Sequence, residues 1–80
     1  MTIAEATVKR LLELCSERNI TINKISNISG ITQSTVSDIV NGTTTNTGIV
    51  TIKKLCDGLG ITIQDFFASN LFADLEQEIE

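Results

Sequence analysis

Residues 21–42 read TINKISNISGITQSTVSDIVNG, and this stretch decides the fold. Thr21 and Thr32 stand where two short helices begin, because a threonine hydroxyl can accept a hydrogen bond from a free N–H group in the first turn of a helix. Gly30 lies between them, where the first helix must end in a left-handed residue, a conformation that glycine adopts without steric cost. Two capped helices joined by so short a turn form a helix-turn-helix.

The residues around both caps support this interpretation. Each threonine is preceded by an isoleucine and followed four residues later by an apolar residue, and the pairs are Ile20 with Ile25 and Ile31 with Val36. Contact between such a pair is the hydrophobic staple, which fixes the angle at which the chain enters a helix. Ile61 and Thr62, with Phe66 four residues after the threonine, repeat the pattern and predict another helix start.

The second helix of the motif has two chemically different faces. Val36, Ile39 and Val40 are spaced three and four apart and are expected to point into a core. The remaining positions are almost all short or hydrogen-bonding: Gln33, Ser34, Thr35, Ser37, Asp38 and Asn41. A helix face that is only solvated usually carries Lys and Glu, which are better helix formers than Ser, Thr and Asn. The composition therefore indicates a helix that reads a partner through hydrogen bonds.

A first helix is predicted from about residue 3 to residue 18. Thr2 and Glu5 have the spacing of a capping box, in which each residue satisfies an N–H group of the other. Helical periodicity predicts that Val8, Leu11, Leu12 and Cys15 point inward.

The chain after the motif reads as a polar loop, two helices and a tail. The loop TTTNTG, residues 43–48, leads into a helix over about 48–59, which Gly60 ends in a left-handed conformation. Its apolar residues are Ile49, Ile52, Leu55, Cys56 and Leu59. A short fifth helix follows over 63–68, with Phe66 or Phe67 filling the core. Because no strand pattern occurs, we predict an all-α five-helix bundle that contains a helix-turn-helix and ends in a short C-terminal helix or tail.

Charge divides the chain into a neutral body and an acidic tail. The net charge is −4, yet residues 1–70 contain equal numbers of acidic and basic side chains. The excess consists of Asp74, Glu76, Glu78 and Glu80. We therefore expect one helix-turn-helix domain over 1–70 and an acidic tail or short helix over 71–80. A neutral body can present a locally positive face, but it lacks the strong attraction that a basic domain has for nucleic acid.

Several classes of protein are excluded by what the sequence lacks. The chain has no histidine, no glycine-rich phosphate loop and no nucleophile beside a base, so we predict that it is not an enzyme and uses no cofactor. No small-molecule ligand is evident. No apolar run is long enough to span a membrane, and the amino terminus does not resemble a signal peptide, so a cytoplasmic protein is expected.

Cys15 and Cys56 can in principle form a disulfide or bind a metal. Both continue the apolar stripes of their helices, so burial as small hydrophobic residues is the better interpretation. Two cysteines without a histidine cannot supply four zinc ligands from protein alone, and we predict no metal site.

Two segments resemble the lambda-repressor-like helix-turn-helix proteins, the group of Cro, the phage repressors and their small bacterial relatives. They are GITQSTVSDIVNG at 30–42 and TIKKLCDGLGITIQDFF at 51–67. The likeness extends over about residues 3–72, and the two motifs at this separation are strongly specific. It implies the five-helix fold and a second motif helix whose N-terminal residues touch base edges in the major groove of DNA.

The resemblance places four side chains of this sequence against bases: Gln33, Ser34, Thr35 and Asp38. Glutamine can bond adenine N6 and N7 together, and serine or threonine can bond a purine or contact a thymine methyl. Asp38 can accept a hydrogen bond from a cytosine amino group, or it can be a solvated acid that repels phosphate, which we favour slightly.

Contacts with the DNA backbone follow less directly from the sequence. Asn41 matches the family's asparagine at the end of the recognition helix, and the hydroxyls of Thr43 and Thr44 can bond phosphate without charge. Helix N-termini bind phosphate through free N–H groups, which nominates Asn23 together with Thr47 or Gly48. Relatives often carry a glutamine at the position of Ile22 and a basic loop at that of residues 43–45, so affinity without sequence preference should be modest.

Four basic residues are weaker candidates for contact with DNA. Lys53 and Lys54 are expected on the outer face of the fourth helix, and Arg10 and Lys24 have similar standing. Such residues usually form the solvent-exposed face of an amphipathic helix, and only a minority of them contact DNA.

Two functions remain open. The first is a sequence-specific DNA-binding transcriptional regulator, for which we favour a repressor. It would act as a homodimer on a palindromic operator of unknown sequence. The second is a protein-interaction module on the same fold, such as an antirepressor or an antitoxin component. Acidity and the uncharged loop favour the second, whereas the polar recognition helix and the resemblance favour the first, which we adopt. Leu71, Phe72 and Leu75 either form the dimer interface or cover the chain's own core.

Overall fold

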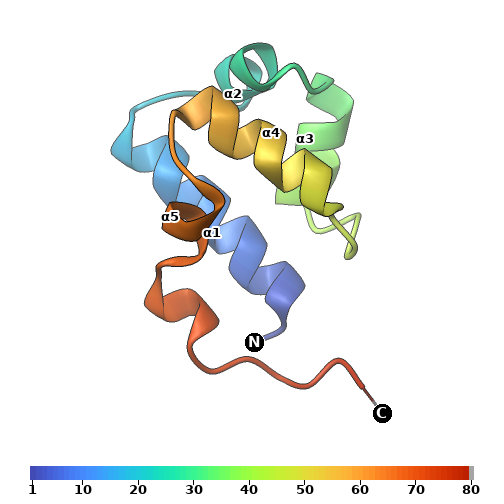
Figure 1. Ribbon diagram of the computed structural model, residues 1–80. Coiled ribbons are helices and arrows are strands. Elements are labelled where there is room, and N and C mark those ends of the chain that lie inside the picture. Colours follow the sequence, from blue (N-terminus) through green and yellow to red (C-terminus); the bar gives the residue numbers. More distant parts are fainter. Residues whose placement is uncertain (80) are drawn as a thin grey trace.

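A computed structural model describes residues 1–79. The chain forms five α-helices followed by one 3₁₀ turn, and the described residues contain no strand (Figure 1). The elements are α1 (Ile3–Glu17), α2 (Ile22–Ser29), α3 (Gln33–Val40), α4 (Ile49–Leu59), α5 (Ile63–Phe67) and η1 (Asn70–Phe72). The predicted all-α five-helix architecture is confirmed. Three helices are one residue shorter than expected, because Arg18, Gly48 and Ala68 act as caps.

The helices begin and end as the cap residues predict. In α2, α3 and α5 the N-cap threonine hydroxyl accepts a hydrogen bond from the backbone N–H three residues later. Thr2 with Glu5 and Thr62 with Asp65 form complete capping boxes. The pKa of Glu5 is lowered because its carboxylate accepts from the backbone N–H and the hydroxyl of Thr2. Gly30 and Gly60 end their helices with φ of 67° and 72°, in the left-handed region.

Two adjoining clusters form the core. The first joins the helix-turn-helix to α1 and α4 through Leu11, Cys15, Ile25, Val36, Ile39 and Leu55. The second attaches α5 to α1 and α4 through Leu14, Ile52, Cys56 and Phe66. The isoleucines of the predicted staples, Ile20, Ile31 and Ile61, pack against these clusters. As a result α2 is held against both α3 and α4, and α3 packs against both α2 and α1.

One apolar position differs from the prediction. Leu12 was expected to point inward, but it is 44% exposed, and Leu14 is buried in its place. Both choices satisfy helical spacing with Leu11 and Cys15, and the position of α5 decides between them. Ile49, one of the apolar residues of the predicted fourth helix, is 64% exposed, because the first turn of α4 lies at the edge of the bundle beside the loop that follows α3 (Figure 1).

Both cysteines are buried free thiols, so the core interpretation is confirmed. Burial raises the pKa of Cys15 and Cys56 above the ordinary value for a thiol. Within residues 1–79, no group of three or more potential metal ligands lies together. No described helix is long and apolar enough to cross a membrane.

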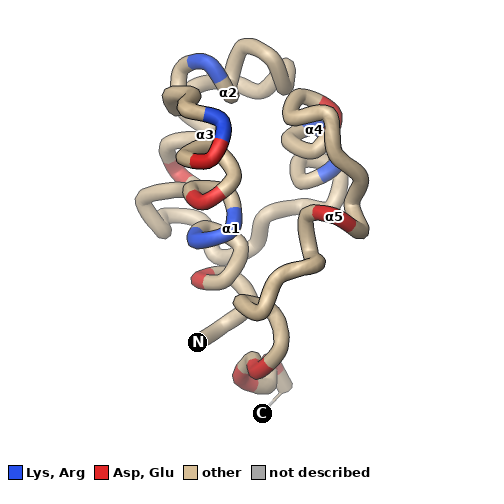
Figure 2. The backbone as a smooth tube through the Cα atoms, turned by 90° about the vertical axis from the view of Figure 1, so that its left-hand side faces the viewer, with Lys and Arg blue, Asp and Glu red and all other residues tan. Residues whose placement is uncertain are grey.

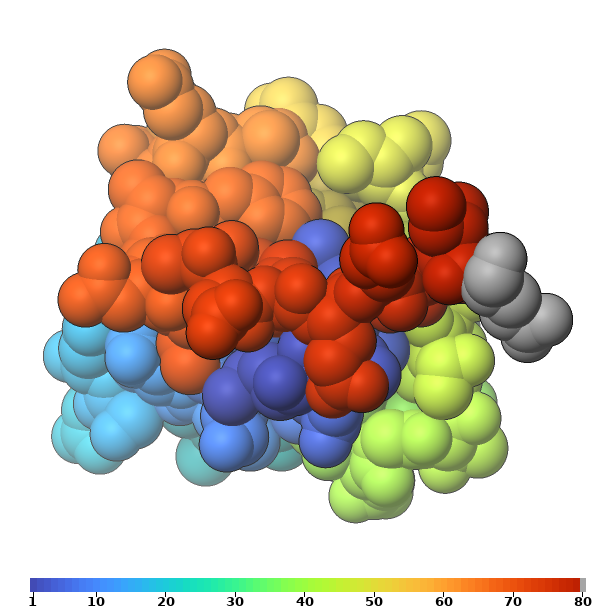
Figure 3. Space-filling view, turned by 90° about the horizontal axis from the view of Figure 1, so that it is seen from below, coloured from blue at the N-terminus to red at the C-terminus, as the bar shows by residue number. Residues whose placement is uncertain are grey.

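The segment after α5 folds back over the body. The Phe72 ring lies 4.8 Å from that of Phe67 and 6.3 Å from that of Phe66, centroid to centroid, and η1 packs against α1. Phe72 therefore covers the chain's own core, one of the two roles that the sequence left open. Beyond η1, the N–H of Glu76 donates to the Met1 carbonyl (3.1 Å), and the tail runs across the start of α1 (Figure 3).

Candidate nucleic-acid interface

One side of helix α3 is buried in the core. The opposite side, called its bare side below, is exposed to solvent. Val36 and Ile39 are 0% and 1% exposed, and Val40 packs against the same cluster. All four side chains predicted to touch bases are exposed, as is Asn41 at the C-cap. With 3.6 residues per turn, Ser34, Asp38 and Asn41 lie along the centre of the bare side, and Gln33 and Thr35 lie at its two edges.

Ser37 lies on the same side of α3, between its centre and the edge at Gln33, and the sequence prediction gave it no contact. It is half-buried and lies one turn beyond Ser34 on the same side of α3. Its spacing of three from Ser34 and four from Asn41 is the sequence signal that could have assigned it to this side of the helix.

The first turn of α3 is tightly organised by its cap. The Thr32 hydroxyl accepts from the N–H of Thr35 (3.2 Å) and donates to the Thr35 hydroxyl (2.8 Å). The Thr35 side chain is therefore held in place and keeps its own proton for a partner. Gln33 and Ser34 make no side-chain hydrogen bond within the described part of the chain, so their full bonding capacity faces solvent.

The loop after α3 uses its own backbone donors. The N–H groups of Thr43 and Thr44 both point to the carbonyl of Asp38, at 3.0 and 3.3 Å. Gly42 makes this reversal possible with a φ of 74°. Thr43 is exposed and Thr44 half-buried, so a contact of either residue with a phosphate comes from its hydroxyl.

Two helix starts carry the other predicted phosphate contacts. Asn23 is exposed in the first turn of α2, where the Thr21 hydroxyl already binds the N–H of Lys24. Gly48 is the N-cap of α4 and offers no side-chain cap, so the first N–H groups of α4 stay open. Thr47, immediately before it, is half-buried.

The basic residues are spread over several helices, and several of them already form ion pairs or hydrogen bonds within the chain. Figure 2 shows Lys and Arg positions on α1, α2 and α4. The sequence of α3, QSTVSDIV, contains neither residue. Lys53 forms an ion pair with Asp57 along α4. Arg10 donates from Nε to the Phe66 carbonyl (2.7 Å) and from a terminal nitrogen to that of Asp65 (2.8 Å). Arg10 therefore fastens α5 to α1, which is a structural role.

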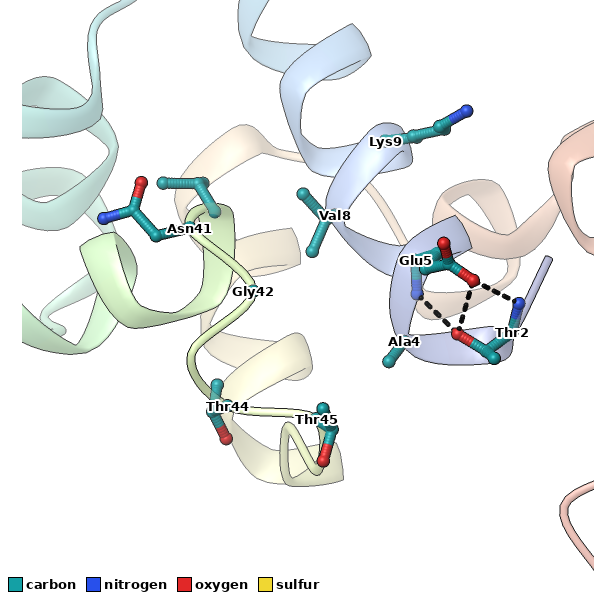
Figure 4. Close-up of a pocket in the computed structure, with 10 residues that line it drawn as sticks. Thr2, Ala4, Glu5, Val8, Lys9, Asn41, Gly42, Thr44 and Thr45 are labelled. Carbon is teal, nitrogen blue, oxygen red and sulfur yellow. Dashed lines mark hydrogen bonds between the residues drawn. The ribbon is translucent and has the colours of Figure 1, made fainter.

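A pocket of about 290 Å³ separates the start of α1 from the end of α3 (Figure 4). Of its polar residues at the α1 end, Thr2 and Glu5 are bonded to each other in the capping box, and the Lys9 side chain points away from the pocket. Asn41 is directed away from them, toward the other side of the loop. The pocket therefore lacks convergent free polar groups, and we assign it no ligand.

Comparison with known proteins identifies the protein family of this chain. The model of the Cro/C1-type HTH DNA-binding domain matches residues 3–70. The crystal structure of the prophage Lp1 protein 11 superimposes with a TM-score of 0.81 at 35% sequence identity, over 94% of this chain and 99% of that one. No curated protein matches the chain. The chain belongs to the Cro/C1-type helix-turn-helix DNA-binding domain family.

Proposed function

We propose that this chain is a sequence-specific DNA-binding transcriptional regulator, a repressor that inserts α3 into the major groove. The observation that carries the proposal is the bare side of α3, where short hydrogen-bonding side chains replace the Lys and Glu of a solvated helix. Repression needs no surface besides this one, because a protein that occupies an operator excludes other proteins from it.

Each position of α3 has a role in this proposal. Gln33 and Ser34 read base edges, since both are exposed and free of internal partners. Thr35 donates its remaining proton or contacts a thymine methyl, and Ser37 lies within the same groove. Asp38 accepts from a cytosine amino group, or otherwise disfavours sequences that place phosphate beside it.

The backbone contacts come from the ends of elements. Asn41 and the hydroxyls of Thr43 and Thr44 bind phosphate at the end of α3, and the starts of α2 and α4 bind it near Asn23, Thr47 and Gly48. Lys24 adds charge in the first turns of α2. Because few cations take part, a single copy binds weakly, and two copies on a palindrome sum their contacts.

The alternative is a protein-interaction module such as an antirepressor or an antitoxin component. It draws support from the net charge of −4 and from the uncharged loop at residues 43–48. Both features reduce attraction to DNA, but neither accounts for the bare side of α3.

Selection from a random library of duplexes at low salt tests the proposal. We expect enrichment of a palindromic motif whose half-sites lie about one helical turn apart. Recovery of no motif by a chain that circular dichroism shows to be helical would refute sequence-specific binding and leave the protein-partner function.

A further inference from the structure

The threonine that caps α3 makes a bond that the other threonine caps do not make. Threonine caps α1, α2, α3 and α5, and each cap hydroxyl accepts from the N–H of the residue three positions later. Those residues are Glu5, Lys24, Thr35 and Asp65. Glu5 and Asp65 return a carboxylate to the N–H of the cap and complete a capping box. At α3 the cap meets a second hydroxyl instead, and the Thr32 hydroxyl donates to it.

The bond between the two hydroxyls gives Thr35 a polarity. The Thr32 oxygen accepts from the Thr35 N–H (3.2 Å) and donates to the Thr35 oxygen (2.8 Å). A hydroxyl that accepts a hydrogen bond becomes a better donor, so the two bonds strengthen each other. The second bond fills a lone pair of the Thr35 oxygen and leaves the Thr35 proton free. Thr35 is therefore held as a hydrogen-bond donor.

The free proton of Thr35 is not used inside the helix. A threonine in a helix often donates to the carbonyl four residues earlier, as Thr7 does to Ile3 (2.8 Å). For Thr35 the equivalent carbonyl is that of Ile31, which accepts from the buried Ser26 hydroxyl. Thr35 is exposed, and no acceptor in the described part of the chain takes its proton. The proton is therefore available to a partner outside the chain.

In the major groove this polarity distinguishes one base from the other three. Guanine offers N7 and O6 as acceptors, adenine offers N7 and thymine offers O4, whereas cytosine offers only its amino donor. A hydroxyl that is free to turn satisfies either kind of group. A hydroxyl held as a donor is satisfied by guanine, adenine or thymine. Against cytosine its proton stays unpaired, which costs free energy.

We propose that Thr32 is a positioning residue for base readout, which holds Thr35 as a donor and makes α3 reject cytosine at the base that Thr35 contacts. The inference rests on the proposed function and adds to it the base that is excluded at one position. Thr32 thus has two roles. Its bond with the Thr35 N–H stabilises the helix on any DNA, and its bond with the Thr35 hydroxyl acts on sequence preference alone.

Binding titrations with the selected duplex and its single-base-pair variants test the inference. The wild type should lose about threefold to tenfold in affinity when cytosine replaces the base that Thr35 contacts. Thr32→Gly removes the hydroxyl at little cost to the cap, so helix content should hold while the discrimination against cytosine disappears. Thr32→Ser keeps a hydroxyl in the same place and should keep the wild-type preference.

A double-mutant cycle shows whether Thr32 acts through Thr35. Thr35→Val removes the second hydroxyl, identifies the base pair concerned, and should abolish the same discrimination. Adding Thr32→Gly to Thr35→Val should then change no preference further. Thr21→Gly is the matched control, because the cap of α2 binds the N–H of Lys24, a residue without a hydroxyl. Every base preference should survive in Thr21→Gly.

Two results would overturn the inference and leave the proposed function standing. One is a Thr32→Gly variant that still rejects cytosine at the base pair identified by Thr35→Val. The other is a Thr35→Val variant that weakens binding to every duplex equally, which would place Thr35 on phosphate. Selection of no motif by the wild type would overturn the proposed function and this inference together.

Discussion

At the scale of single residues, Gly58 sets how closely α2 and α4 approach each other. A Cβ atom there would lie 2.4 Å from the Ser29 hydroxyl oxygen and 3.0 Å from the carbonyl group of Ile28. Ser29 is itself buried, and its hydroxyl has no hydrogen-bond partner in the described part of the chain. Glycine is therefore required at this position by space, whereas at Gly30 it is required by a positive φ.

We predict that Gly58→Ala lowers stability. Alanine in a helix interior normally gains about 1 kcal/mol over glycine, but the clash with α2 should cost about 1–3 kcal/mol and exceed that gain. Thermal unfolding followed by circular dichroism measures the change. Adding Ser29→Ala, which removes the nearest atom, should recover part of the loss.

Gly48→Ser serves as the control for Gly58→Ala. No atom lies within 4 Å of a Cβ at Gly48, and serine is a good N-cap residue, so stability should hold or rise slightly. A Gly58→Ala variant as stable as the wild type would show that α2 and α4 do not pack as closely as described.

At the scale of elements, the sequence predicted helix starts better than helix faces. A cap depends on groups within about four residues, so the Ile-Thr pattern was sufficient for α2, α3 and α5. The buried face depends on which other elements a helix meets. For that reason periodicity admitted Leu12 as well as Leu14 on α1, and the residue it selected, Leu12, is the exposed one.

The cap of α3 gives the prediction at this scale. Thr32→Ala removes the acceptor for the Thr35 N–H and should cost about 0.5–2 kcal/mol of stability. Thr45→Ala, at an exposed loop position, is the control and should cost much less. Urea unfolding measures both variants. Equal midpoints for the two would contradict the role of Thr32 as the cap.

At the scale of the whole molecule, contacts distant in sequence were beyond prediction. Arg10 reaches the carbonyls of α5 across 55 and 56 residues, and nothing in the local pattern distinguishes it from a solvated arginine. The aromatic cluster of Phe66, Phe67 and Phe72 likewise depends on how elements assemble. The candidate site was more accessible to prediction, because most of it lies on one amphipathic helix and adjoining turns.

The central claim is that α3 reads DNA sequence, and the most direct test is a binding titration with the selected duplex and its single-base-pair variants. The account predicts that Gln33→Ala loses about 1–3 kcal/mol on the selected duplex and no longer distinguishes the base pair at one position. Asn41→Ala should weaken binding to every duplex about equally, and Gln64→Ala, an exposed glutamine on α5, should change nothing. If Gln33→Ala binds every duplex as the wild type does, with the same preference at every position, α3 is not the reading helix.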